Sequence, residues 1–259
     1  MKMDSNTILI TGGASGIGFE LAKRFLVLGN TVLITGRNRE KLEQARAGLP
    51  GVHIFQGDVG DPASIEALHR EVVSRFPRLN VLINNAGIMR NLDLGDSSAD
   101  LTDLVQEIET NLSGSIRMVH RFLPTLRSNS KAAIVNVSSG LAFIPFVFAP
   151  VYGATKAGIH SYTQSLRQQL KGSGVEVFEL APPATATGLS AAFGPGAGTG
   201  EMSTQKMLDF ALKELAKGKS EILPGAARVL KLMSRVAPTF FFHRLSAVFA
   251  RMVTRPPTV

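Results

Sequence analysis

Short apolar runs rich in β-branched residues alternate along the chain with longer segments in which apolar residues recur at helical spacing. Near-continuous apolar strands that alternate with helices are typical of parallel sheets covered on both faces. The pattern therefore predicts a single α/β domain built on a doubly wound parallel sheet with helices on both faces. The expected strands are Thr7–Ile10, Thr31–Thr35, Val52–Phe55, Val81–Ile83, Ala133–Val137 and Val175–Leu180, and helices are expected before Leu28, over Arg39–Ala47, from Asp61 onwards, and near 100–127 and 152–171.

The helix expected from Asp61 has the clearest start signal. Asp61 stands at the N-cap position and Pro62 at the first helical position, where the missing N–H has no partner to lose. The glycine-rich and polar motifs of the chain follow directly after the expected strands. Because ligands of doubly wound sheets bind beyond the carboxyl ends of the strands, this placement predicts one site along that edge.

Composition narrows the classes of protein. With 259 residues, 44% of them hydrophobic, the chain can bury a substantial core. There is no cysteine, and the five histidines (53, 69, 120, 160 and 243) include no pair at metal-binding spacing, so neither disulfides nor a metal centre is expected. No apolar run approaches the roughly 18 residues that span a bilayer, and the first residues do not resemble a signal peptide. A cytoplasmic protein is expected.

The net charge of +8 is concentrated at one end of the chain. Residues 225–259 hold six Lys or Arg and no acidic residue, which leaves residues 1–224 with about +2. The pI of about 10.0 therefore does not indicate a nucleic-acid partner for the whole protein. Phe240–Phe242 and the later apolar residues of this segment recur at helical spacing, with arginines between them. Such a basic amphipathic helix suits an anionic membrane surface, and packing between subunits explains it equally well.

The turn after the first strand, Thr11–Gly18, is rich in glycine and opens a helix. Glycine allows a tight turn and close approach of the backbone to a phosphate, and the helix N-terminus offers unpaired N–H groups. Between a strand and a helix, this turn predicts a Rossmann-type dinucleotide site. The candidate cofactor contacts here are Gly12, Ser15, Gly16, Ile17 and Gly18.

The residues after the second and third strands bear on the choice of cofactor. No acidic residue stands at positions 35–38, where one would hold the ribose hydroxyls of NAD, and Arg37 can bind a 2′-phosphate. NADP(H) is therefore preferred over NAD(H), with Arg37 and Asn38 as contacts; a solvated surface arginine is the alternative. Asp58 and Val59 are candidates for the adenine, and a loop-capping aspartate is the alternative for Asp58.

Four motifs in order resemble the short-chain dehydrogenase/reductase family. They are Thr11–Gly18, Asn84–Gly87, Val135–Ser139 and Tyr152–Lys156, and Asn111 lies between the second and the third. The resemblance covers about residues 5–190 and implies an enzyme that transfers hydride between a nicotinamide and a carbonyl or secondary alcohol. It also implies a homodimer or homotetramer. By the family pattern, Asn85, Ala86 and Gly87 contact the cofactor.

The resemblance assigns chemical roles to Tyr152, Lys156, Ser139 and Asn111. Tyr152 would exchange a proton with the substrate oxygen, and Ser139, thirteen residues earlier, would hydrogen-bond that oxygen. Lys156 shares a helix face with Tyr152, so its charge is expected to lower the tyrosine pKa, and it would hold the nicotinamide ribose. Asn111 would hold a water that links Lys156 to solvent. Ser138 competes with Ser139, and Asn111 could instead bond only to backbone.

One turn departs from the family pattern. After the sixth strand the family commonly has Pro-Gly, whereas this chain has Pro182-Pro183, followed by Thr185 and Thr187, which would contact the cofactor. This turn and the basic tail loosely resemble a bacterial subgroup associated by name with D-alanylation operons.

The resemblance leads to a division of the chain into two parts. Residues 1–224 are expected to form the NADP-binding Rossmann catalytic domain, including a substrate loop at 188–202, and residues 225–259 a basic amphipathic C-terminal extension. The apolar stretch between Ser139 and Tyr152 suggests an apolar substrate, although a subunit interface or ordinary packing explains it equally well. It contains Leu141, Phe143, Ile144, Phe146, Val147 and Phe148. The alternative function is a catalytically silent nucleotide-binding regulator or scaffold, whose tail mediates membrane or subunit association.

Overall fold

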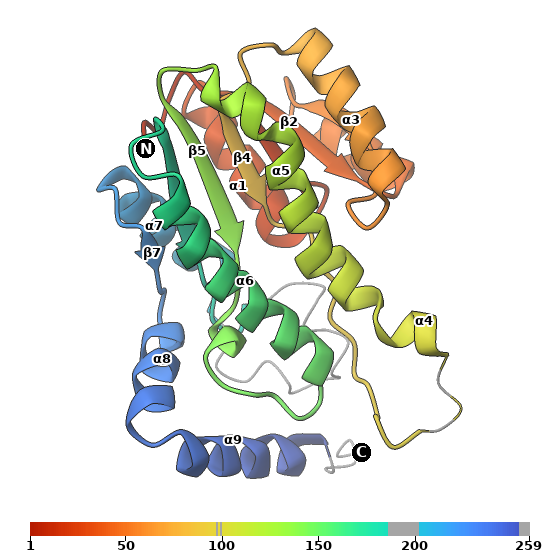
Figure 1. The fold of residues 1–259 in the computed structure, drawn as a ribbon, viewed down its shortest axis with the longest axis vertical. Helices are drawn as coiled ribbons and strands as arrows, with labels where there is room; N and C mark the ends of the chain where they lie inside the picture. The colour runs from red at the N-terminus through yellow and green to blue at the C-terminus, as the bar shows by residue number, and fades with distance from the viewer. Residues whose placement is uncertain (97, 99, 186–201, 254–259) are drawn as a thin grey trace.

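One parallel sheet carries the fold in a computed structural model, which describes residues 1–96, 98, 100–185 and 202–253 (Figure 1). Within these residues the sheet has seven strands in the order β3-β2-β1-β4-β5-β6-β7, all parallel to their neighbours. The chain moves outward from β1 in both directions, so the predicted doubly wound sheet is confirmed. The strands are β1 (Thr7–Thr11), β2 (Thr31–Gly36), β3 (His53–Gln56), β4 (Val81–Asn84), β5 (Ala132–Val137), β6 (Val175–Leu180) and β7 (Glu221–Ile222).

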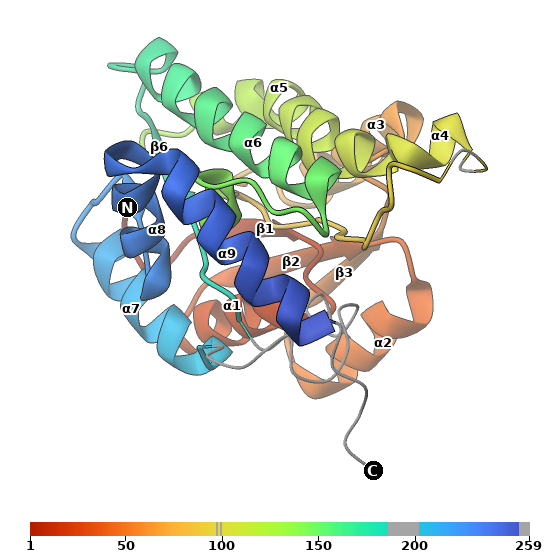
Figure 2. The ribbon, with the colours of Figure 1, turned by 90° about the horizontal axis from the view of Figure 1, so that it is seen from below.

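Helices cover both faces of the sheet (Figures 1 and 2). One face is covered by α1 (Gly16–Val27), α2 (Arg39–Gly48) and α7 (Thr204–Ala216), and the other by α3 (Pro62–Arg75), α5 (Gly114–Arg127) and α6 (Pro150–Gln169). In β1, Ile8 and Ile10 join the first apolar core while Leu9 joins the second. This burial on both sides explains why the strand is apolar throughout.

The start of α3 agrees with its sequence. The Asp61 side chain accepts hydrogen bonds from the N–H groups of Ala63 and Ser64, at 3.0 and 3.1 Å, and Pro62 opens the helix. The elements that were not expected from the sequence include β7 and α7. The strand β7 has only two residues, too few to show a pattern, and α7 follows the segment 186–201, which lies outside the described residues.

The helix expected near residues 100–127 is divided into three parts. They are α4 (Leu101–Leu104), a π-helical turn η1 (Ile108–Ser113) and α5. Gly114 begins α5 where a Cβ atom would lie 2.6 Å from the carbonyl oxygen of Val59, so the helix can pass this loop only without a side chain. A π-helical turn inserts a residue into the helix and is frequent at functional sites. Here it contains Asn111.

The C-terminal extension forms two helices, α8 (Ala226–Val236) and α9 (Pro238–Val253). Figure 2, seen from below, shows α9 crossing the end of the molecule toward which the strands point. A helix, α9, therefore lies where one was expected; its amphipathic character stays a prediction, because the side chains beyond residue 247 lie outside the description. In the part of the chain that is described, no helix combines the length and apolarity needed to cross a membrane.

Candidate active site

The glycine-rich turn after β1 depends on close backbone contacts. Gly12 has a φ of +64° and donates from its N–H to the carbonyl of Thr35, at 2.8 Å. A Cβ atom on Gly18 would lie 2.3 Å from the carbonyl oxygen of Gly12, and one on Gly13 would lie 2.4 Å from the side chain of Ile34. Such contacts exclude any side chain, so these glycines hold the turn against the sheet. Gly16 also has a positive φ, of +54°.

The N-terminus of α1 is open toward the turn. Ser15 is its N-cap, but its side chain accepts no hydrogen bond from the first helical turn, and that turn has no acidic residue. Asn85 holds the turn from the side of β4: its side-chain N–H groups donate to the carbonyls of Thr11 and Gly12, at 3.0 and 3.2 Å. The Thr11 hydroxyl in turn accepts from the N–H of Ala86 at 3.0 Å. Unpaired N–H groups and a positive helix end remain available to an anion.

The residues predicted to contact the adenosine part lie beside the same turn. Arg37 is exposed, and no ion pair of its side chain is found among the described residues, whereas Arg39 pairs with Glu43. Asn38 caps α2 by accepting from the N–H of Lys41, at 2.9 Å. Asp58 accepts from the N–H of Gly60, at 2.8 Å, and so caps its loop. The structural alternative considered for Asp58, a loop-capping aspartate, is thus present, and Val59 beside it is buried.

Tyr152, Lys156 and Ser139 come together at the carboxyl end of β5. Tyr152 and Lys156 lie one turn apart on α6 and are buried, with 6% and 4% of their surface exposed. Interaction with the Ser139 side chain lowers the pKa of the Tyr152 phenol, and the Ser139 hydroxyl accepts from the N–H of Leu141 at 3.1 Å. The Lys156 Nζ lies 5.6 Å from the centre of the Tyr152 ring and donates to the carbonyl of Val137, at 2.8 Å.

Burial works against charge at both titratable groups. Burial raises the pKa of Tyr152 to about 12, although the hydrogen bond with Ser139 lowers it, and the negative charge of Glu107 raises it further. Burial also lowers the pKa of Lys156 to about 8. Burial of the phenol therefore outweighs any lowering of its pKa by Lys156 in this structure, and the role of Lys156 in the reaction stays a prediction. The ammonium is held by the Val137 carbonyl, and loss of water around the phenol is the larger effect.

Asn111 connects the π-helical turn to the loop after β4. Its Oδ1 accepts from the N–H of Ile88 at 2.8 Å, and its Nδ2 donates to the Ile88 carbonyl and to the hydroxyl of Thr155, at 2.9 and 3.1 Å. The two bonds to Ile88 are backbone bonds, as in its alternative role, but they reach the loop after β4 and not the helix itself. Gly87 lies between the side chains of Asn111 and Lys156. A Cβ atom on Gly87 would be 3.3 Å from the Asn111 Oδ1 and 3.6 Å from the Lys156 Nζ.

Glu107 is a buried carboxylate that the sequence analysis did not single out. It lies four residues before Asn111 and has no exposed surface. Its Oε1 accepts from the N–H of Arg90, at 2.8 Å, while its Oε2 has no hydrogen-bond partner among the described residues. Burial raises the pKa of Glu107, although the hydrogen bond and charge of Arg90 oppose the rise. Its place one helical turn from Asn111 is the signal that could have found it.

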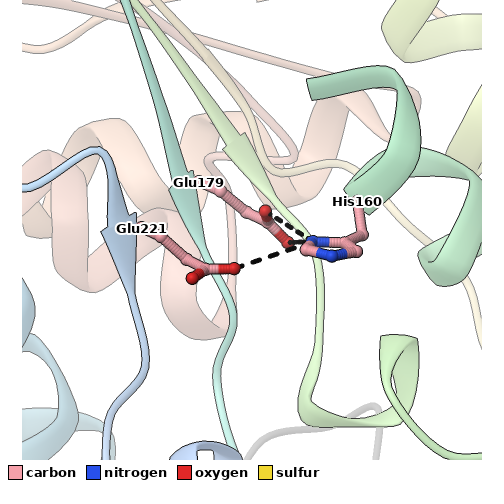
Figure 3. A group of neighbouring side chains, drawn as sticks. All are labelled: His160, Glu179 and Glu221. Atoms are coloured by element: carbon pink, nitrogen blue, oxygen red, sulfur yellow. Dashed lines mark hydrogen bonds and ion pairs between the residues drawn. The ribbon is translucent and has the colours of Figure 1, made fainter. Parts of the chain in front are cut away.

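A second polar group missed by the sequence analysis lies behind Ser139. The hydroxyl of Ser138 donates a hydrogen bond to Glu179 of β6 at 2.5 Å. It is therefore directed into the sheet and not toward the site of Ser139 and Tyr152. Glu179 also contacts His160 of α6, and Glu221 of β7 lies beside them (Figure 3). His160 follows Lys156 by four residues, a spacing visible in the sequence, whereas the two glutamates are brought together only by the pairing of β6 with β7.

Apolar side chains form the wall around the tyrosine. Phe146, Ala149 and Tyr152 make a small buried cluster with Met89 packed against it. A neighbouring groove of about 420 Å³ is lined by the expected apolar stretch, by the small residues of α6 and by Phe242 of α9. The C-terminal extension therefore borders the region between Ser139 and Tyr152.

The Pro-Pro turn follows β6. Thr185 is buried, donates to the carbonyl of Pro183 at 2.8 Å and pairs through a β-bridge with Met202. Thr187 and most of the expected substrate loop, residues 188–201, lie outside the described residues.

These residues fit a nicotinamide dinucleotide. The fit rests on the turn from which Gly12, Gly13 and Gly18 exclude side chains, and on the open N-terminus of α1. Along the same edge stand Arg37 at one end and the buried Tyr152–Lys156 pair at the other. Such a sheet, with a phosphate-binding turn and a tyrosine–lysine pair, defines a nicotinamide-dependent oxidoreductase.

Residues 6–197 match the short-chain dehydrogenase family, and the chain belongs to the short-chain dehydrogenase/reductase family. It is 44% identical over 224 residues to the uncharacterized oxidoreductase DltE of Bacillus subtilis, covering 86% of this chain and 89% of that protein. Serine 3-dehydrogenase of Agrobacterium fabrum is 37% identical over 182 residues, which cover 69% of this chain and 71% of that protein. The resemblance to this family and, loosely, to the D-alanylation subgroup is confirmed.

Solved structures support the same assignment. A short-chain dehydrogenase from Burkholderia cenocepacia in complex with NADP is similar with a TM-score of 0.81 at 25% identity, over 95% of this chain and 99% of that one. The chain is therefore an NAD(P)-dependent oxidoreductase that acts on a small-molecule carbonyl or alcohol.

Proposed function

We propose that the protein is an NADP(H)-dependent reductase of an apolar carbonyl compound, or the dehydrogenase of the corresponding secondary alcohol. The observation that carries this proposal is the burial of Ser139, Tyr152 and Lys156 at one end of β5, with the Lys156 ammonium 5.6 Å from the centre of the Tyr152 ring. The alternative, a silent scaffold, would not need a titratable pair held in a desolvated position.

The proton step follows from the pKa of Tyr152. A phenol with a pKa of about 12 is protonated near neutral pH, the form that can donate a proton to a carbonyl oxygen. Ser139 would share a hydrogen bond with that oxygen as negative charge develops on it. The nicotinamide supplies the hydride when bound. Lys156 would hold the nicotinamide ribose, and its charge stabilises the phenolate left after proton transfer.

The preference for NADP(H) rests on Arg37. Its guanidinium is exposed at the carboxyl end of β2 and is not neutralised by a described acidic neighbour, so it can bind a 2′-phosphate. The apolar substrate is supported by the wall of Phe146, Met89 and Leu141 around Tyr152. By the family pattern we also expect a homodimer or homotetramer.

Two measurements test the proposed function. NADPH should raise the melting temperature more than NADH does, and a panel of apolar ketones and aldehydes should include compounds that the enzyme reduces with NADPH. Tyr152→Phe should lose about 10²- to 10⁴-fold in turnover. Tyr162→Phe is the matched control, because Tyr162 lies on the same helix and packs in the second core away from Ser139. Full activity in Tyr152→Phe would disprove the mechanism.

We propose that the C-terminal extension also contacts the anionic surface of a membrane from the cytoplasmic side. Along α8 and the start of α9, Val229, Leu232, Val236 and Phe240 are exposed, and residues 225–259 contain no acidic residue. Sedimentation with anionic vesicles should occur at low salt and weaken at high salt. Absence of sedimentation at low salt would leave subunit packing as the role of this face.

A further inference from the structure

The polar group behind Ser139 joins three elements of the fold. Figure 3 shows the carboxylates of Glu179 and Glu221, from the neighbouring strands β6 and β7, directed toward the ring of His160 on α6. Glu179 and Glu221 are paired directly in the sheet register. The His160 Nδ1 lies 2.8 and 3.0 Å from the two oxygens of Glu179, and 3.9 Å from Glu221.

Two carboxylates that face each other across a strand pair repel, and the Glu179 side chain is only 1% exposed. The repulsion is offset by Lys231 of α8, whose ammonium forms an ion pair with both oxygens of Glu221. One histidine and two glutamates could also ligate a divalent metal. However, Lys231 already holds the Glu221 carboxylate, and Gln164 contacts the other ring nitrogen of His160 at 2.8 Å. The group is therefore an ionic network.

The network is directly attached to the strand that ends at Ser139. The Ser138 hydroxyl donates to Glu179, and the backbone on both sides of Ser139 is held by the same region. The N–H of Ser138 donates to the Leu180 carbonyl at 2.8 Å, and that of Gly140 donates to the Pro182 carbonyl at 2.7 Å. The chain around Ser139 is thus fixed by β6 and by the side chain of Glu179.

The network is attached equally to the helix that carries the tyrosine and the lysine. His160 lies one helical turn after Lys156 and two turns after Tyr152 on α6. Glu179 therefore bridges the strand end with Ser139 and the helix with Tyr152. The distance between these two elements sets the position of Ser139 relative to Tyr152.

Lys231 extends the network to the C-terminal extension. It lies on α8, and its Nζ is 5.5 Å from the centre of the Phe143 ring, which in turn packs edge-on against His160. The same helix covers Gly140, where a Cβ atom would meet Leu230 at 3.1 Å and Ala227 at 3.5 Å. The first helix of the extension is therefore packed on the turn that follows Ser139.

We propose that Ser138, His160, Glu179, Glu221 and Lys231, the Glu179 network, position Ser139 against Tyr152, and that α8 is thereby a necessary part of the active centre. Glu179 and Lys231 are its principal positioning residues. The inference rests on the proposed function, because it takes Ser139 and Tyr152 as the reacting groups. A displacement of about 1 Å between reacting groups costs on the order of a hundredfold in rate, so a network that fixes this distance controls turnover.

Glu179→Gln is the first test. Glutamine keeps the shape and an acceptor for Ser138 but removes the charge that faces His160. In the full-length enzyme, kcat for the best ketone should fall on the order of ten- to a hundredfold, while the Kd for NADPH from fluorescence stays within about twofold. Glu176→Gln is the matched control on the same strand, because Glu176 is exposed and, among the described residues, its one ion pair is with the N-terminal amine at 3.4 Å. It should retain the wild-type kcat.

Lys231→Met provides a second variant, at a residue of α8 outside the sheet. It should lower kcat by about tenfold, and Lys231→Arg should recover most of that loss because it restores the ion pair with Glu221. Adding Glu221→Gln to Lys231→Met should cause little further loss, since coupled residues are not additive. If the Glu179→Gln and Lys231→Met enzymes fold and keep the wild-type kcat, the positioning role of the network is overturned, while the proposed function still stands. Absence of NADPH-dependent turnover in the wild type would overturn the proposed function, and the inference with it.

Discussion

The two ends of the active-site edge are built on different physical principles. At the nucleotide end, around the turn Thr11–Gly18, the fit depends on the absence of side chains, and polar groups such as Asn85 serve the backbone. At the chemical end, Tyr152 and Lys156 are desolvated. Burial raises the pKa of the tyrosine and lowers that of the lysine, so it favours the neutral form of each. Binding is thus a matter of shape, whereas the chemistry depends on electrostatics that burial makes costly.

Lys156→Met tests the chemical end with the largest expected effect. Loss of the ammonium should lower kcat by at least about a hundredfold, because no charge then stabilises the phenolate. Stability should not fall in parallel. The pKa of Lys156 in the folded state, about 8, lies below the usual 10.5. At pH below 8 the folded protein therefore holds a buried charge, and this charge lowers the free energy of unfolding.

The melting temperature of Lys156→Met should therefore equal or exceed that of the wild type at pH 6 to 7. This advantage should shrink as the pH rises through 8 toward 10.5, since the wild-type lysine then becomes neutral in the folded state. Thermal unfolding across this range checks the sign. Lys171→Met, at an exposed residue just after α6, is the control and should change neither quantity. A clearly less stable Met variant at pH 6 would show that the bond to Val137 outweighs desolvation.

Gly18→Ala tests the nucleotide end. A Cβ atom would lie 2.3 Å from the Gly12 carbonyl oxygen and 2.5 Å from the Asn85 Nδ2, so the turn must open. We expect NADPH affinity to fall on the order of tenfold or more, with kcat at saturating cofactor less affected. Gly48→Ala is the matched control, because its Cβ would meet Phe19 at an ordinary 3.6 Å. Equal NADPH affinity in the two variants would contradict the steric account.

Arg37→Gln separates charge from shape at the nucleotide end. If the guanidinium binds a 2′-phosphate, the Kd for NADPH should rise about tenfold, the size of a lost charge-assisted hydrogen bond, and that for NADH should not change. Arg39→Gln is the control, since Arg39 is already paired with Glu43 at 2.6 Å. A similar loss for both cofactors would remove Arg37 as the basis of the preference.

The same contrast explains how far the sequence could be interpreted. The strands and the glycine-rich turn were predictable because apolar runs and glycines act locally, and the six expected strands agree with β1 to β6 within one residue at each end. The pKa of Tyr152 was not predictable, because it depends on burial and on Glu107, which reach it through tertiary packing. The pairing of Glu179 with Glu221 likewise requires a two-residue strand that leaves no pattern.

Glu107→Gln has the smallest expected effect and tests the charge balance at the chemical end. The negative charge of Glu107 raises the pKa of Tyr152, so its removal should lower that pKa. Alcohol oxidation requires the phenolate and rises with pH through this pKa. Its pH profile should therefore move to lower pH in the variant.

The matched control is Glu109→Gln on the same helical turn, because the Glu109 side chain is half-exposed and pairs with Arg117 at 2.7 Å. Its profile should remain that of the wild type. At pH values low enough to protonate Glu107, whose own pKa burial raises, the profiles of Glu107→Gln and wild type should converge. A shift of the Glu107→Gln profile to higher pH would show that the carboxylate acts on the loop at Arg90 and not on the phenol. Electrostatics at the chemical end would then be set by Ser139 and burial alone.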